Sequence, residues 1–201
     1  MCFFYVIAII TDHTMKILLI ADRPPEKPIL EILATNPVDL IITLGDLESS
    51  ELRGLDQVTH IPKLGVYGNH CSGMYFDSLG IRNMHMQTFA YRGVTFGGFE
   101  GCVRYKESIY AKMYTQDEAS ELLKSFPHVD VMLSHCPPFG VNDDQSDISH
   151  TGFIGLRDYI QREKPKALFH GHTYPTAATL VQKVDSTQII YVYGSMIYDL
   201  I

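Results

Sequence analysis

The stretch "DLIITLGD", residues 39–46, decides the fold class. Five consecutive apolar or β-branched residues precede a Gly-Asp turn, and the run is too short for a buried helix. A continuous apolar run of this kind is typical of a strand inside a parallel sheet, with both faces covered. The polar Asp46 follows where the strand ends, at the edge where ligands of α/β folds collect.

Similar short apolar runs alternate with helical patterns on both sides of this strand. We expect strands at 16–21, 63–68, 130–135 and 166–171, a hairpin of 86–93 with 94–101, and a final strand pair at 177–184 and 187–194. Helices are predicted at 26–36, 115–126 and 151–163, the second with a capping box of Thr115 and Glu118. The pattern predicts an α/β chain with added antiparallel strands, folded as two packed mixed β-sheets flanked by helices.

Each strand of the alternating set ends at a polar side chain that could bind a metal ion. These side chains are Asp22, Asp46, Asn69 with His70, His135 and His172. One such ending means little, because aspartates often cap helices or form turns. Five successive endings converge on one rim, and their mixed oxygen and nitrogen ligands suit Mn²⁺, Fe²⁺ or Zn²⁺ better than Ca²⁺.

The order of these residues resembles the calcineurin-like metallophosphoesterase superfamily, from about residue 16 to the C-terminus. The motifs that carry the resemblance are "LIITLGD" (40–46), "GNH" (68–70), "LSHCPP" (133–138) and "FHGHT" (169–173). The resemblance implies a four-layer α/β/β/α fold and a two-metal phosphoesterase site. It places the metal-bridging carboxylate at Asp46, and the second metal on Asp46, Asn69, His135 and His172.

The first metal of the family site is degenerate in this sequence. The family pattern Asp-X-His reads Asp22-Arg23-Pro24 here, and the second His of Gly-His-X-His is Tyr174. Only Asp22 and the shared Asp46 remain for that ion. We therefore expect one well-bound divalent ion, manganese first and Fe²⁺, Zn²⁺ or Mg²⁺ as alternatives, with a second ion weak or absent.

Further residues receive roles from the resemblance. His70 matches the catalytic histidine that assists the leaving group, although Cys71 replaces the acidic residue that usually follows it. His150 matches a histidine that contacts substrate before a helix. Arg23 and Tyr174 are expected to contact substrate. For Arg23 this holds only if the segment is not extended, because neighbouring side chains of an extended chain point to opposite faces and Asp22 would face the site. His170 is a weaker candidate for a compensating ligand.

Composition limits the partners. The chain has 201 residues and a net charge of −7, which argues against a nucleic acid duplex as partner and suits a small phosphorylated substrate. Four cysteines show no disulfide framework, in keeping with the cytoplasm. The apolar start at 1–14 is too short to span a membrane. We interpret it as an extension before a single domain at 15–201, either from an over-long translation start or as an extra edge strand or peripheral anchor. The sequence leaves the oligomeric state open.

Two functions follow from these observations. The first is a metal-dependent phosphoesterase, in which a metal-activated water hydrolyses a phosphodiester or a small phosphomonoester. The second is a catalytically impaired protein of the same fold that acts as a binding or scaffold module. Loss of the first metal's histidine ligands favours the scaffold, and the retained His70 favours the enzyme.

Overall fold

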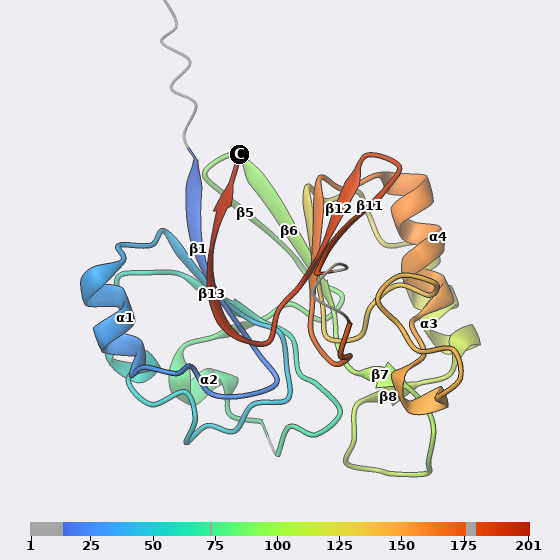
Figure 1. Cartoon of the computed structure of the whole chain (residues 1–201), viewed down its shortest axis with the longest axis horizontal. Coiled ribbons are helices and arrows are strands. Elements are labelled where there is room, and N and C mark those ends of the chain that lie inside the picture. Colours follow the sequence, from blue (N-terminus) through green and yellow to red (C-terminus); the bar gives the residue numbers. More distant parts are fainter. Residues whose placement is uncertain (1–13, 73, 176–179) are drawn as a thin grey trace, which may run out of the picture.

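The computed structural model describes residues 14–72, 74–175 and 180–201, which form two large sheets packed face to face (Figure 1). The first sheet has the order β13-β1-β2-β3-β4, the strands being Gly194–Leu200, Met15–Ala21, Leu40–Thr43, Lys63–Gly65 and Arg82–Asn83. The second has the order β11-β12-β10-β9-β6-β5, the strands being Val181–Val184, Thr187–Tyr191, Ala167–His170, Val131–Ser134, Val94–Phe99 and Thr88–Tyr91. A separate small pair joins β7 (Cys102–Val103) to β8 (Met113–Tyr114).

Strand alternation divides the apolar residues among three cores. In β1, Ile17 and Leu19 face the second sheet, whereas Leu18 and Ile20 face outward. The second sheet alternates in the same way: Leu133 of β9 lies in the central core between the sheets, and Met132 lies in the core on the opposite face. Strands covered on both faces read as continuous apolar runs, which is why "LIIT" shows no polar alternation.

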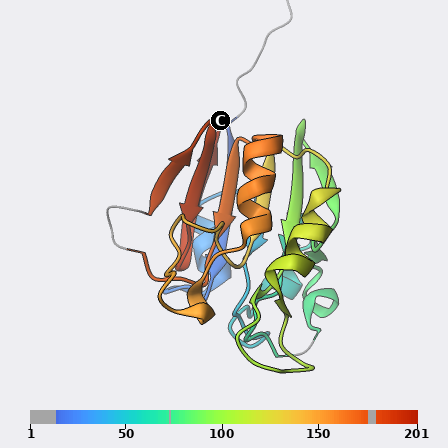
Figure 2. The same cartoon turned by 90° about the vertical axis from the view of Figure 1, so that its right-hand side faces the viewer.

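Helices cover the outer faces and complete the four layers. Helices α1 (Ile29–Thr35) and α2 (Phe76–Leu79) cover the first sheet, and α3 (Gln116–Lys124) and α4 (Ile154–Glu163) cover the second, as Figure 2 shows for α3 and α4. Short 3-10 turns lie at Leu55–Gln57 (η1) and Ile148–His150 (η2). The predicted capping box is present: the Thr115 hydroxyl accepts from the Glu118 N–H, and the Glu118 carboxylate accepts from the Thr115 N–H.

The fold confirms the expected two mixed sheets with flanking helices and corrects three details. The last strand was expected at 187–194, but β12 ends at Tyr191 and Gly194 begins a further strand, β13, which runs antiparallel to the whole of β1. The helix expected from residue 26 begins at Ile29, after Pro28. The helix expected from residue 151 begins at Ile154, so His150 lies in η2 and not at that helix's N-terminus.

The remaining strand predictions hold where the structure describes the chain. The hairpin turns at Arg92 and Gly93 between β5 and β6, and β11 pairs antiparallel with β12. Residues 1–13 of the predicted extension and residues 177–179 of the final strand pair lie outside the described residues. Among the helices that the structure describes, none has the length and apolar character needed to cross a membrane.

Candidate metal site

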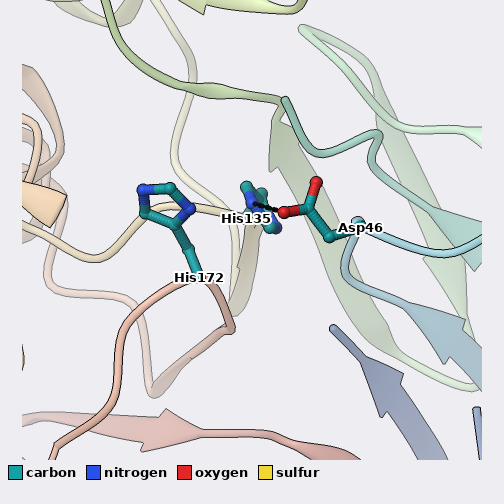
Figure 3. A group of neighbouring side chains, drawn as sticks. All are labelled: Asp46, His135 and His172. Carbon is teal, nitrogen blue, oxygen red and sulfur yellow. Dashed lines mark ion pairs between the residues drawn. The ribbon is translucent and has the colours of Figure 1, made fainter. Parts of the chain in front are cut away.

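Parallel pairing brings the carboxyl ends of the central strands to one rim between the sheets. Strands β1, β2 and β3 run parallel in the first sheet, and β6, β9 and β10 run parallel in the second. Asp46 follows β2, His135 follows β9 and His172 follows β10. One potential ligand atom from each of these three residues lies within 4.8 Å of the others, and Figure 3 shows the side chains converging.

His135 is held in a fixed orientation by a backbone carbonyl. Its Nδ1 lies 2.8 Å from the carbonyl oxygen of Leu44; because a carbonyl only accepts, Nδ1 carries the proton and donates it. Nε2 faces Asn69 Oδ1 at 3.1 Å and Asp46 Oδ2 at 3.4 Å, and the ring offers a lone pair there once Nε2 has lost its proton. Three electron-pair donors then face one another, an arrangement that either a proton on Nε2 or a metal ion stabilises.

His172 contributes the fourth donor by the same logic. Its Nε2 lies 2.7 Å from the carbonyl oxygen of Ser149, so Nε2 is the protonated nitrogen. In Figure 3 the other ring nitrogen faces His135 and Asp46, and the two imidazole centroids are 4.7 Å apart. Carbonyl contacts of this kind fix the tautomer of metal-binding histidines. The set of one carboxylate, one amide and two imidazoles fits a divalent transition metal.

Two glycines make room for this arrangement. A Cβ at Gly68 would collide with the Asp46 carboxylate, and a Cβ at Gly45 would lie 2.7 Å from Nδ1 of His135 and clash with the Gly68 backbone. The backbone before Asn69 thus approaches the carboxylate as closely as it can. Asp46 is further fixed by the N–H of His70, which donates to Oδ1 at 2.7 Å. The Asp46 carboxylate and the Asn69 amide are therefore already in position to bind an ion.

Asp22 has a different contact from the one that the family resemblance implies. Both of its carboxylate oxygens accept from the backbone N–H of His172, at 3.0 and 2.9 Å. Asp22, Asp46 and His172 all have positive φ, at 64°, 52° and 71°. Such backbone is costly for residues other than glycine and persists where the surroundings enforce it. At His172 the Asp22 carboxylate is part of those surroundings, because it holds the backbone N–H.

The metal-free site stores a proton. Burial alone would lower the pKa of His135, but the Asp46 and Asp22 carboxylates outweigh it and raise that pKa to about 9. Burial raises the pKa of Asp22 to about 7, although His135 opposes this. Burial and then the charge on His135 lower the pKa of His172 to about 3. The proton on His135 thus occupies the position between the donors that a metal ion would take.

Metal affinity is therefore expected to rise with pH. His135 is protonated below about pH 9, and binding must release that proton. Between pH 7 and 9, above the pKa of Asp22, the affinity for Mn²⁺ should increase by about tenfold per pH unit. Titration of the metal-free protein with Mn²⁺ at several pH values, with free Mn²⁺ followed by electron paramagnetic resonance, measures this affinity directly. A constant affinity across this interval would contradict the assigned proton on His135.

The catalytic candidate His70 contacts the site through its backbone. Its side chain is exposed, while its backbone N–H is tied to Asp46. Cys71 was expected to be a poor replacement for an acidic residue, yet its sulfur accepts from the N–H of Gly68 at 3.2 Å. The thiol therefore braces the Gly-Asn-His turn from inside. Its pKa is raised, chiefly by burial, which keeps it a thiol.

The other predicted residues lie around this centre and not in it. Arg23 stacks 4.6 Å over the Tyr193 ring and pairs with Glu26; the expected alternation of facing does not apply, because Asp22 is not extended. Tyr174 is 72% exposed, with its pKa raised by burial and then by Asp22, which disfavours a phenolate ligand.

Two more histidines were candidates. The His150 ring lies 5.4 Å from that of His172, and its Nδ1 donates to Asp147 at 2.7 Å. His170 is fully buried and bonds to Asn142 and to the Gly171 carbonyl, so it is a core residue apart from the cluster. Sequence reasoning missed the Leu44 and Ser149 carbonyls, because a backbone oxygen carries no residue-type signal.

Comparison with solved structures supports the architecture. TT1561 of Thermus thermophilus aligns with a TM-score of 0.61 at 15% identity, over 90% of each chain. The chain has the metallophosphoesterase fold. A Zn²⁺ complex of Vps29 from Entamoeba histolytica aligns at 14% identity and a TM-score of 0.46, over 90% of this chain and 74% of that one.

A novel archaeal phosphodiesterase is similar at 14% identity and a TM-score of 0.49, over 90% of this chain and 84% of the other. No family model and no curated protein matches the chain. At these identities the likeness shows the fold, and the activity has to be argued from the site itself.

Proposed function

We propose that this protein is a metal-dependent phosphoesterase of the calcineurin-like superfamily that works with one tightly bound divalent ion, manganese first. The observation that supports it is the convergence of Asp46, His135 and His172 between the sheets, with Asn69 Oδ1 3.1 Å from Nε2 of His135. The substrate would be a phosphodiester or a small phosphomonoester. When bound, the ion supplies a Lewis acid that activates water and neutralises phosphate charge.

The residues of this chain divide the remaining work. Asp46 supplies the anionic ligand and, through the His70 N–H, sets the position of the Gly-Asn-His turn. The exposed imidazole of His70 would donate a proton to the leaving oxygen. Asp22 holds the His172 backbone and so takes the role of a positioning residue in place of a ligand of a second ion.

Replacing His70 by alanine is expected to lower kcat/KM for bis(4-nitrophenyl) phosphate by about 100-fold, the usual contribution of a general acid. The backbone bond to Asp46 survives the change, so the bound metal should stay. Activity in Mn²⁺ and metal content are measured on the same samples. His60→Ala, which removes an exposed histidine elsewhere, is the matched control. Equal activity of His70→Ala and His60→Ala would rule out the role given to His70.

A binding or scaffold module is the second candidate. It is favoured by one observation, that Pro24 and the exposed Tyr174 cannot complete a first metal site. One assay of metal binding and turnover distinguishes the two functions. A protein that binds one ion but turns over no phosphodiester or phosphomonoester with any divalent metal would support the module.

A further inference from the structure

A hollow of about 570 Å³ opens beside the candidate metal site, between the loop at 142–150 and the segment after β10. His150 lines it, and the His150 ring lies 5.4 Å from the ring of His172. The hollow therefore begins one side chain away from the metal position. A group attached to a phosphate at the metal would reach into it.

The charged side chains that line the hollow are acidic. They are Asp143, Asp144 and Asp147, and no lysine or arginine of the described residues joins them. Hydrogen bonds from Ser149, His150 and Ser146 lower the pKa values of Asp147 and Asp144, so both stay ionised near neutral pH. Both positions are fixed, since Asp144 accepts from the N–H and the hydroxyl of Ser146, and Asp147 accepts from the N–H and the hydroxyl of Ser149. The hollow therefore carries a stable negative charge.

Two further features point to an organic ligand. Tyr174 forms one wall; its ring is in edge contact with the rings of His150 and Tyr193, and at 72% exposure much of its side chain is still open to a ligand. Thr173 also lines the hollow; it is 2% exposed, and its hydroxyl has no hydrogen-bond partner among the described residues. An aromatic face beside carboxylates is the combination that binds quaternary and primary ammonium groups. A second anionic phosphate would be repelled from the same place.

We propose that the hollow is a subsite for an organic cation, so that the preferred substrates are phosphate esters of an amino alcohol such as choline. This inference rests on the proposed phosphoesterase function and adds the substrate class to it. Hydrolysis of such a diester adds one water across a P–O bond, releasing the other alcohol and leaving the phosphorylated amino alcohol. The ammonium group stays in the acidic hollow while the phosphate lies at the metal position.

Selectivity between two chromogenic diesters tests the subsite. The Mn²⁺-loaded protein should cleave 4-nitrophenyl phosphorylcholine with a kcat/KM about tenfold above that for bis(4-nitrophenyl) phosphate. Asp144→Asn keeps the acceptor for Ser146 and removes the charge, and Tyr174→Ala removes the aromatic wall; each should collapse this ratio towards one. Asp158→Asn, an exposed charge change on α4, should leave it unchanged. An unchanged ratio in both subsite variants would overturn the inference.

Binding to the metal-free protein gives a readout independent of turnover. Choline chloride should shift the amide resonances of residues 143–150 and of Tyr174 in a nitrogen-15 spectrum, and Asp144→Asn should weaken the binding. Hydrolysis of both diesters with no preference and no choline shifts would leave the phosphoesterase standing and refute the subsite. Choline shifts without any hydrolysis would support the subsite and refute the phosphoesterase.

Discussion

Asparagine in place of Asp46 is expected to remove the bound metal and with it nearly all phosphoesterase activity. The change keeps the size of the side chain and an acceptor for the N–H of His70. It removes the carboxylate charge that faces His135 at 3.4 Å. Stabilisation of transition-state charge by a metal amounts to several kcal/mol, so kcat/KM should fall by about 100- to 10,000-fold.

The same substitution should also release the proton on His135. Asp46 is the largest influence that raises the pKa of His135 against burial, so the metal-free variant should titrate at lower pH than the wild type. The nitrogen-15 chemical shifts of the His135 ring, followed against pH, measure this pKa. Asp158→Asn is the control for a lost surface charge. Retention of full metal content in Asp46→Asn would contradict the site as described.

The second large effect concerns Asp22. Alanine at this position leaves the His172 N–H without its two carboxylate partners and frees a backbone held at φ 71°. Loss of a residue that orients a ligand costs about 10- to 100-fold in metal affinity. We expect Asp22→Ala to bind Mn²⁺ more weakly by this factor, with the stoichiometry still one ion per chain.

Asp22→Asn separates positioning from ligation. The amide oxygen can accept from the His172 N–H, so this variant should recover most of the affinity lost in Asp22→Ala. If Asp22 were instead a ligand of a second ion, the wild type would bind two ions and both variants would bind one. Isothermal titration of the three metal-free proteins distinguishes these outcomes.

Much of this arrangement could be read from the sequence because it depends on local patterns. Continuous apolar runs predict strands covered on both faces, and a polar residue directly after each run predicts the rim. Asp46, Asn69, His135 and His172 are predictable in this way. Thr115 and Glu118 form their capping box because the motif is complete within four residues.

The parts that could not be predicted depend on contacts distant in sequence. Strand β13 forms by pairing with β1, at the other end of the chain. Nothing in the local sequence separates β13 from the strand that precedes it. Asp22 looks like a ligand by its position, and only the fold reveals that the His172 backbone, 150 residues away, takes both of its oxygens. The structural role of Cys71 was not predicted, because its sulfur accepts from the N–H of Gly68, which only the folded turn brings near.

The central claim is that one ion binds among Asp46, Asn69, His135 and His172. Titration of the metal-free protein with Mn²⁺ at pH 8, with the metal content counted by mass spectrometry after dialysis, tests it most directly. One ion per chain in the wild type and none retained in Asp46→Asn is the predicted result. Two ions of comparable affinity, or none at all, would contradict it.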